Sequence, residues 1–422
     1  MGFNLTNAPS FFLSDLSGDG NLDLIANEAN WSSKKFTVYD TTQIPFRDIT
    51  SETISSAKKA YDVAVADFNG DLRPDLYLTI GAGDDSDLYQ NGADKATVSL
   101  SVNKNEKGLQ FDTSGEVTFD LQALDSDKSQ IPLNQIYIGK NGTHPIGWNF
   151  TLSPNDTNIG GILPHTQGVD RGIYIGFDAD LQRWQLLLSS SEVNNLIGNI
   201  ETTEPISELS AIGFQADPPP PDDQLLINTG QGFIDQSDLA GINSIPIRGR
   251  SVTAGDFDND MDQDIYIVTN RSVLNTPDIL LENQGDGTFV AISGAGGAEG
   301  TEIGQGDFVM AADYDLNGFL DLLVANGHQE KTSPLITNAP YQLFHNQGNS
   351  NHWLEIDLQG VASNRDGIGA QVFLTAGGVT QLREQSGGIH NAVQNYQRLH
   401  FGLADNTSAQ ELIINWPSGR VQ

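Results

Sequence analysis

Short apolar runs, separated by polar turns, recur along this chain and predict β-strands. Four pairs of such runs enclose a nine-residue polar segment, in the order strand, loop, strand. The paired runs are 11–13 with 24–26, 63–66 with 76–78, 252–254 with 265–268, and 309–312 with 322–324. Helical periodicity is scarce and glycine is frequent, with 44 residues. The pattern therefore predicts an all-β chain with many tight turns.

A second repeated element follows each of these hairpins. It reads as a strand, an Asn/Gly turn and another strand at 225–233, at 280–289 and, more weakly, at 343–349. Residues 36–39 with 46–49 are the expected equivalent in the first repeat. Each unit thus offers four strands in roughly 55 residues, which is the content of one blade of a β-propeller.

The spacing of the units predicts an inserted domain. The first two polar segments start 52 residues apart and the last two 57, but 189 residues separate the second from the third. Removing about 130 residues, near 93 to 222, restores the regular repeat. That stretch carries six or more short alternating strands and ends in a proline-rich spacer at 217–223. We expect a β-sandwich inserted into the second blade, which either splits that blade's hairpin or replaces a degenerate blade.

The four polar segments share one spacing of oxygen-bearing side chains, at positions 1, 3, 5 and 9. A hard cation such as Ca²⁺ prefers six or more oxygen ligands, and position 7 varies as expected if it supplies only its backbone carbonyl. The candidate ligands are Asp15, Ser17, Asp19, Asn21 and Asp23; Asp67, Asn69, Asp71, Arg73 and Asp75; Asp256, Asp258, Asp260, Asp262 and Asp264; and Asp313, Asp315, Asn317, Phe319 and Asp321.

These segments differ from EF-hands, which carry a bidentate Glu at position 12 between two helices. Position 12 is Ala26, Leu78, Ile267 or Val324, each inside an apolar run. We therefore expect about four calcium sites in strand-to-strand loops, with a structural role. The alternative is a set of turns that bind nothing. The third loop has four carboxylates at its side-chain positions, so we expect it to bind calcium most tightly.

Net charge and composition exclude several classes of function. The formal net charge of −34 argues against nucleic acid and against anionic membrane surfaces as partners. No apolar stretch is long enough to span a membrane. The chain has no cysteine, so it has no disulfide framework and no thiolate site. Because weak calcium sites fill near millimolar calcium, we expect an extracellular or cell-surface protein, such as a secreted bacterial one.

No basic region followed by an apolar run marks a signal peptide in this chain. Met1 lies only 14 residues before the first loop, so we expect a piece of a longer protein. Catalytic signatures are equally scarce: the histidines lack metalloprotease spacing, and neither a Gly-x-Ser-x-Gly elbow nor a phosphate loop is present. Trp148, Trp184, Tyr137 and Tyr174 form either a sugar-stacking platform or core of the insert.

The loops and the elements that follow them resemble FG-GAP/VCBS repeats, as in integrin α-subunit heads. Residues 351–358, 363–370, 398–403 and 416–421 look like the ASPIC/UnbV domain of the cartilage acidic protein family and its bacterial relatives. The resemblance implies a secreted, calcium-binding β-propeller with adhesion or matrix roles and no established catalytic residues. It also implies about seven blades, whereas four repeats are evident. The expected domains are 1–92 and 223–350 (blades), 93–222 (inserted sandwich) and 351–422 (ASPIC/UnbV-like).

These observations favour a non-enzymatic binding or adhesion scaffold for a glycan or protein ligand. Two alternatives remain. One is a polysaccharide-active lyase or hydrolase on a propeller, because Asp/Glu pairs abound. The other is a structural module of a matrix or assembly.

Overall fold

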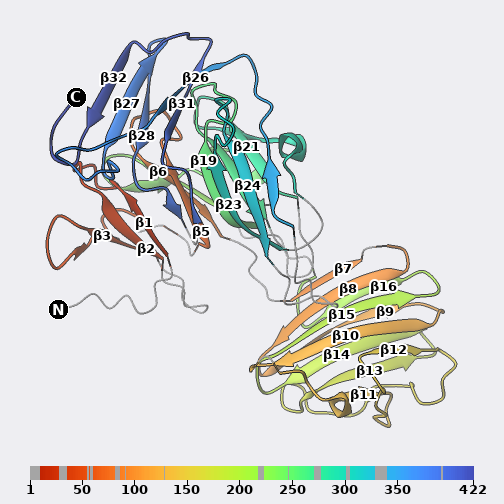
Figure 1. The fold of residues 1–422 in the computed structure, drawn as a ribbon. Coiled ribbons are helices and arrows are strands. Elements are labelled where there is room, and N and C mark those ends of the chain that lie inside the picture. The colour runs from red at the N-terminus through yellow and green to blue at the C-terminus, as the bar shows by residue number, and fades with distance from the viewer. Residues whose placement is uncertain are drawn as a thin grey trace.

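The structure is a computed structural model of the 422-residue chain. It describes residues 10–27, 36–54, 57, 60–80, 86–90, 92–127, 129–216, 223–245, 247–269, 277–300, 305–327, 340–390 and 393–422. These residues form β-strands and three short 3₁₀ turns, Leu133–Gln135, Ile242–Ser244 and Ser293–Gly297, with no α-helix among them. The expected all-β fold class is therefore confirmed (Figure 1). Within these ranges no helix has the length and apolar character of a membrane span.

Four antiparallel sheets with the strand order of propeller blades follow one another along the chain. They are β1-β2-β3-β4, β5-β6-β17-β18, β19-β20-β21-β22 and, with three described strands, β23-β24-β25. Their strands are β1 Ser10–Ser14, β2 Asp23–Asn27, β3 Phe36–Asp40, β4 Arg47–Asp48, β5 Asp62–Ala66, β6 Asp75–Thr79, β17 Gln224–Asn228, β18 Phe233–Asp235, β19 Gly249–Gly255, β20 Asp264–Thr269, β21 Ile279–Asn283, β22 Phe289–Ile292, β23 Gln305–Ala312, β24 Asp321–Gly327 and β25 Gln342–Phe344.

Apolar cores join each blade to the next, because the central strands are apolar on both faces. The three cores are exemplified by Phe12, Ile25, Val63 and Leu76 between blades 1 and 2; by Tyr77, Leu225, Val252 and Ile265 between blades 2 and 3; and by Phe257, Tyr266, Val309 and Leu322 between blades 3 and 4. The first strands β5, β19 and β23 lie side by side. This stacking brings the polar loops of all four blades to one end of the molecule.

The insert splits the second blade between its second and third strands. β6 and β17 are hydrogen-bonded neighbours, with Leu76 opposite Leu226, although the whole insert lies between them in sequence. Tyr77 donates a hydrogen bond to Asp223 at 3.0 Å, as Tyr266 does to Asp278 in the third blade at 3.1 Å. The blade is thus completed across the insertion, and the insert lies between the blade's two hairpins, β5-β6 and β17-β18, rather than within either of them. Residues 217–222 of the proline-rich spacer lie outside the described residues.

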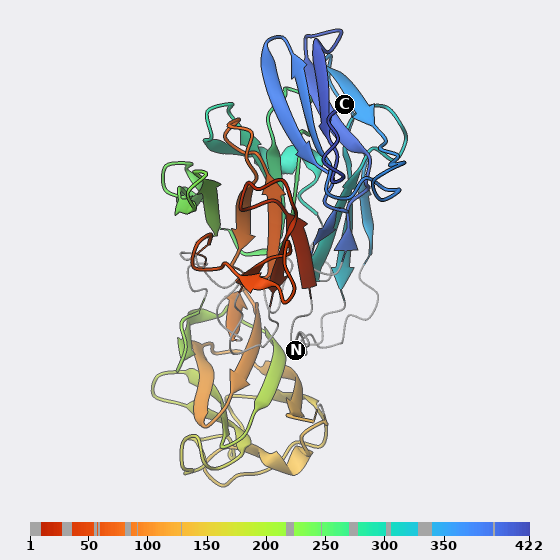
Figure 2. The same ribbon diagram turned by 90° about the vertical axis from the view of Figure 1, so that its left-hand side faces the viewer.

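The insert consists of two five-stranded sheets packed face to face and projects from the blades opposite the C-terminal strands (Figures 1 and 2). The sheets are β12-β10-β15-β8-β7 and β11-β13-β14-β9-β16. Their strands are β7 Asp87–Gln90, β8 Lys95–Val102, β9 Asn105–Asp112, β10 Val117–Asp125, β11 Ile136–Ile138, β12 Asn149–Leu152, β13 Gly172–Asp178, β14 Arg183–Ser190, β15 Asn194–Thr202 and β16 Ser207–Ile212. The first paired strand begins at Asp87, ahead of the expected boundary at residue 93.

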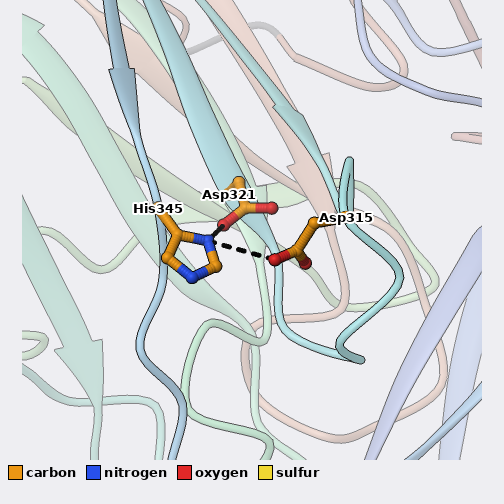
Figure 3. Close-up of side chains that lie close together, drawn as sticks. All are labelled: Asp315, Asp321 and His345. Carbon is orange, nitrogen blue, oxygen red and sulfur yellow. Dashed lines mark ion pairs between the residues drawn. The ribbon is translucent and has the colours of Figure 1, made fainter.

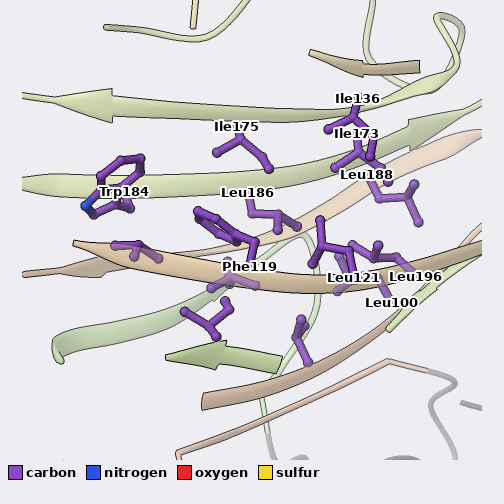
Figure 4. Packing of buried hydrophobic residues seen from close by; sticks show 14 of the residues in the cluster. Leu100, Phe119, Leu121, Ile136, Ile173, Ile175, Trp184, Leu186, Leu188 and Leu196 are labelled. Atoms are coloured by element: carbon purple, nitrogen blue, oxygen red, sulfur yellow. The ribbon is translucent and has the colours of Figure 1, made fainter. Parts of the chain in front are cut away.

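Aromatic residues of the insert lie mainly in its core. Trp184 is fully buried between the sheets, near Phe119 and Ile175 (Figure 4). Tyr174 is 3% exposed and stacks on Tyr137, with ring centroids 5.1 Å apart. The sugar-stacking interpretation of these residues is wrong for Trp184 and Tyr174, because burial leaves neither ring face available to a ligand.

The C-terminal residues form two small sheets and a short hairpin that sit on the loop end of the blades. The sheets are β26-β31 and β28-β27-β32, and the hairpin is β29-β30. Their bounds are β26 His352–Ile356, β27 Gln371–Ala376, β28 Val379–Glu384, β29 Ile389–His390, β30 Val393–Gln394, β31 Leu399–Ala404 and β32 Glu411–Asn415. The hairpin lies against the innermost strands β1, β5 and β23 of three blades. It therefore occupies the centre of the blade array.

The fourth repeat departs from the expected strand, turn and strand at 343–349. β25 is followed by an extended segment that leads directly to β26 of the C-terminal domain. The side-chain amides of Asn349 and Asn351 both donate to the carbonyl of Asp258, so this segment crosses to the loop of the third blade. The loss of a regular fourth strand follows from that crossing.

Candidate metal-binding loops

Each nine-residue loop is folded by hydrogen bonds from its own backbone to its own carboxylates. In the second loop, Asp67 accepts the N–H groups of Asp71 at 3.0 Å and Leu72 at 2.9 Å. Asn69 accepts the Asp71 N–H at 3.1 Å, and Asp75 accepts the Phe68 N–H at 2.9 Å. These bonds fold the loop into one tight turn that carries the side chains of positions 1, 3, 5 and 9.

The same bonds recur in the other three loops. The position 1 carboxylate accepts the position 5 and position 6 N–H groups in every case, and the position 5 side chain accepts the position 7 N–H. The accepting pairs are Asp15 and Asp19, Asp256 and Asp260, and Asp313 and Asn317. The first loop differs at two bonds: Asp23 accepts the N–H of Ser17 rather than that of position 2, and the Asp19 N–H bonds to Asp15 without a bond to the position 3 side chain. The repeated spacing therefore corresponds to a repeated three-dimensional structure.

Positions 4 and 6 of every loop have a positive backbone φ. The residues are Gly18, Gly20, Gly70, Leu72, Asn259, Met261, Leu316 and Gly318. A side chain costs on the order of 1 kcal/mol in this region of φ, yet Leu72 and Met261 adopt it. The carboxylate at position 1 holds the position 6 N–H in place and so fixes this strained turn.

An asparagine at the end of the third strand of blades 2 and 3, and two residues after it in blade 4, connects its own loop to that of the preceding blade. The backbone N–H of Asn283 donates to Asp264 at 3.0 Å. The side-chain amide of Asn283 donates to the Phe68 carbonyl of blade 2 at 2.9 Å and to the Gln263 carbonyl at 3.1 Å. Asn228 and Asn346 make the same three bonds in blades 2 and 4. Loop geometry and blade stacking are therefore linked.

Burial and mutual repulsion raise the pKa of many loop carboxyls. Burial, the largest cause, and the neighbouring carboxylates together raise the pKa of Asp75 and of Asp256 to about 7. The same causes raise the pKa of Asp23, Asp258 and Asp262 to about 6. Carboxylates held this closely favour a bound cation, which would offset their repulsion.

The C-terminal domain places one cation above these loops. The partly buried Arg383 donates from Nε to the His400 carbonyl at 2.9 Å, and its charge faces Asp67, Asp256 and Asp262. Burial lowers the pKa of Arg383, and the three carboxylates oppose that effect. The role of Arg383 could not be predicted from the loop motif, because the residue lies on β28 of the C-terminal domain, far from the loops in sequence.

Further contacts tie the C-terminal domain to three of the loops. Gln371 donates to Asp15 at 3.2 Å, and the Gly402 N–H donates to Asp256 at 3.1 Å. His400 Nε2 lies 3.0 Å from the Gly318 carbonyl of the fourth loop. A Cβ atom at Gly402 would collide with the Asp256 carboxylate, so only glycine permits this approach.

Two clusters in the described residues bring three candidate metal ligands within 4.8 Å of one another. One is Asp256, Asp258 and Asp260, all expected from the sequence. The other is Asp315, Asp321 and His345, of which His345 was not expected (Figure 3). At position 7, Arg73 pairs with Asp71 at 2.8 Å and the Phe319 ring packs on Trp353. Those two side chains thus point to protein partners, which leaves their carbonyls as the candidate ligands.

Comparison with known families and proteins matches these regions. The FG-GAP-like repeat matches residues 15–78 and 256–324, and the ASPIC and UnbV family matches residues 360–422. Cartilage acidic protein 1 of Mus musculus is 30% identical over 187 residues, which is 42% of this chain and 27% of that protein. Its Homo sapiens counterpart is 28% identical over 186 residues, 42% of this chain and 26% of that protein. The chain thus spans about a quarter of the length of these curated relatives.

The matches confirm the resemblance expected from the sequence. FG-GAP-like repeats and a C-terminal ASPIC and UnbV domain occur together in this chain, as they were expected to do. This combination supports a β-propeller-like binding or adhesion module, and the families and relatives are non-enzymatic in kind. The inserted sandwich lies between the two repeat matches and outside both families' matched ranges.

Proposed function

We propose that this chain is an extracellular, non-enzymatic binding scaffold whose four blade loops each hold a calcium ion. The proposed ligands are the oxygen atoms at positions 1, 3, 5, 7 and 9 of each loop, named above. Each ion would join the two inner strands of one blade. The stack of blades would then present the insert and the C-terminal domain as recognition surfaces.

The observation that carries this proposal is the fourfold repetition of one oxygen-lined loop. The hydrogen bonds of each loop hold its carboxylate and amide or hydroxyl side chains in one tight turn, and such oxygen donors suit Ca²⁺. The pKa of Asp75 and of Asp256 is raised mainly by burial and further by neighbouring carboxylates, so a bound cation would stabilise the ionised form of both groups. Nitrogen and sulfur ligands are missing from the first three loops, which favours calcium over zinc there.

Thermal melting across a calcium titration tests the proposal. The purified chain is melted in a chelator and then at calcium concentrations up to about 10 mM, with magnesium as the matched control. Binding to the native state alone raises the melting temperature as calcium increases. A flat response, together with metal analysis showing no bound calcium, would refute the calcium sites.

A groove beside the fourth blade is a candidate surface for the glycan or protein ligand. It has a volume of about 580 Å³ and is lined by Met310, Tyr314, Leu323, Leu343 and Tyr396. Tyr314 is 52% and Tyr396 56% exposed, so both rings are available to stack on a ligand.

Screening against glycan and protein libraries, with Tyr396→Ala as the test variant, checks this surface. Loss of binding in the variant supports it, whereas undiminished binding moves the ligand site elsewhere. Turnover of a polysaccharide by the native chain, abolished by one acidic substitution outside the loops, would instead establish an enzyme.

A further inference from the structure

We propose that the fourth loop is a mixed nitrogen and oxygen site that selects a transition-metal dication such as Zn²⁺. His345 would add an imidazole nitrogen to the carboxylates of Asp315 and Asp321. This inference rests on the proposed metal binding by the loops, and at the fourth loop it replaces calcium with a transition-metal dication. It assigns two chemical classes of cation to one repeated structure.

The three side chains converge on a single point. His345 Nδ1 lies 3.4 Å from Asp315 Oδ2 and 3.3 Å from Asp321 Oδ1 (Figure 3). Zinc binds His nitrogen and carboxylate oxygen at about 2.0–2.2 Å, which puts neighbouring ligands of a tetrahedral ion about 3.3–3.6 Å apart. The observed separations match that spacing, so one ion can bridge the three atoms with little movement.

Backbone hydrogen bonds hold both carboxylates in this orientation. Asp315 accepts the Asn317 N–H through Oδ1, which leaves Oδ2 directed at His345. Asp321 accepts the Tyr314 N–H through Oδ2 and the Asn346 N–H through Oδ1. The Tyr314 ring meets the His345 ring edge to face, with centroids 6.0 Å apart. The site is therefore supported around its ligands, as a selective metal site requires.

Comparison of the repeats shows that His345 occupies a position that faces the loop. It directly precedes Asn346, which corresponds to Asn228 and Asn283 in the other blades. The residues that match His345 in blades 2 and 3 are therefore Ile227 and Glu282. Glu282 raises the pKa of Asp258 in its own loop, so its charge reaches the third site. At this position blades 2, 3 and 4 thus carry an apolar side chain packed in the core, a carboxylate and an imidazole.

The choice of cation follows from ligand chemistry. Calcium takes oxygen ligands and binds imidazole weakly, whereas Zn²⁺ and Co²⁺ readily take imidazole together with carboxylate. An imidazole at this position therefore lowers the preference of the fourth loop for calcium. The alternative role of His345 is to pair, when protonated, with Asp315 and Asp321 without any metal.

Titration of the metal-free full chain with Co²⁺ and Zn²⁺, in saturating calcium, separates these roles. We expect one equivalent of Co²⁺ to give intense visible absorption and to be displaced by Zn²⁺. His345→Ala should weaken Zn²⁺ binding at least tenfold, and His345→Glu should weaken it while strengthening calcium binding to the fourth loop. His352→Ala removes a nearby exposed histidine and should leave Zn²⁺ binding unchanged.

The outcomes distinguish this inference from the proposed function. Equal Zn²⁺ affinity in His345→Ala and the native chain, or displacement of the Zn²⁺ by millimolar calcium, would overturn the mixed site. If calcium still raised the melting temperature, the calcium scaffold would stand. If neither ion bound, both proposals would fall. Circular dichroism of each variant confirms that it is folded.

Discussion

At the scale of single residues, the central carboxylates of each loop act in two ways. Asp260 accepts the Asp262 N–H at 3.0 Å and lies within 4.8 Å of candidate ligand atoms on Asp256 and Asp258. It is thus both a part of the folded loop and a proposed ligand. Without a metal, the two roles of Asp260 have opposite effects on the stability of the loop. Its hydrogen bond stabilises the loop, whereas its negative charge repels the neighbouring carboxylates and destabilises it.

Replacing Asp260 by alanine should therefore lower stability mainly when calcium is present. We expect calcium affinity of the third loop to fall at least tenfold and the gain in melting temperature on adding calcium to shrink. In chelator the loss should be small, since the removed charge relieves repulsion. Calorimetric titration and melting with and without calcium check this. Asp286→Ala, at an exposed turn of the same blade, is the control; an unaltered calcium response in Asp260→Ala would contradict the assignment.

Asp278 provides a pH-dependent test that is remote from the loops. Burial raises the pKa of Asp278 to about 7, although hydrogen bonds from Thr269 and Tyr266 oppose the rise. The folded state therefore holds this proton more tightly than the unfolded chain, whose Asp pKa is about 3.9. Stability from this group is fully present below pH of about 4 and is lost as the pH rises toward about 7.

The variant Asp278→Asn should flatten that part of the stability profile. An amide cannot ionise, so the variant keeps a neutral group in the buried site at every pH. Urea unfolding measured from pH 4 to pH 8 should show a smaller decline for the variant than for the native chain. The exposed Asp180→Asn should follow the native profile. Parallel curves for native chain and Asp278→Asn would show that Asp278 is ionised at little cost.

At the scale of elements, hydrophobic alternation and loop spacing predict most of the blade strands. Pairs such as 63–66 with 76–78 appear in the structure as neighbours because apolar runs around a tight polar loop have few other ways to pair. Long-range pairing was harder to predict. Asn228 bonds to Asp75 across a sequence separation of 153 residues, so no local pattern links them. The insertion point stayed open in the sequence for the same reason.

The side-chain role of the linking asparagines is a second feature that sequence could not provide. In the sequence, an asparagine before Gln-Gly is explained by a tight turn alone. Only the stacked blades show that the Asn283 side chain also donates to the Phe68 carbonyl of the preceding blade. Asn283→Ala removes the two hydrogen bonds that its side-chain amide donates. It also removes the bond that its side-chain oxygen Oδ1 accepts from the Gly285 N–H at 3.1 Å. At about 0.5–1.5 kcal/mol each, their loss should cost about 2–4 kcal/mol.

Urea unfolding of Asn283→Ala measures this loss. Gln284→Ala is the matched control, because Gln284 is the next residue and is exposed, and it should change stability by less than about 0.5 kcal/mol. Equal unfolding midpoints for the two variants would show that the asparagine does not join the blades. A loss confined to Asn283→Ala would establish the bond between blades 2 and 3 as a stabilising contact.

At the scale of the whole molecule, the C-terminal domain and the blades share one buried polar interface. Arg383 contributes its charge to loops of blades 2 and 3, and Gln371 contacts the loop of blade 1. The hairpin that follows places His390 3.0 Å from Asp62 on the innermost strand of blade 2. The C-terminal domain thus contacts the loop end of the blades through polar groups. Several of these groups lie beside carboxylates, so the strength of the contact depends on the charge of those carboxylates.

Replacing Arg383 by methionine tests whether that charge and the bound cations act together. The substitution keeps much of the volume but removes the positive charge beside Asp67, Asp256 and Asp262. Removing this charge leaves the nearby carboxylates less compensated and deletes the charged hydrogen bond to the His400 carbonyl, so we expect a loss of about 1.5–3 kcal/mol. A bound calcium ion supplies compensating charge, so the destabilisation should be larger in chelator than in saturating calcium. Arg365→Met, at an exposed arginine of the same domain, is the control.

Unfolding of the native chain and of Arg383→Met, each with and without calcium, forms a thermodynamic cycle. A smaller loss of stability with calcium would mean that cations in the loops and Arg383 neutralise the same carboxylates. The removal of Arg383 would then also raise calcium affinity, since the two positive charges repel. An equal loss under both conditions would mean that Arg383 stabilises the domain contact through packing and its hydrogen bond to His400 alone. The proposed calcium sites would then be energetically independent of the C-terminal domain.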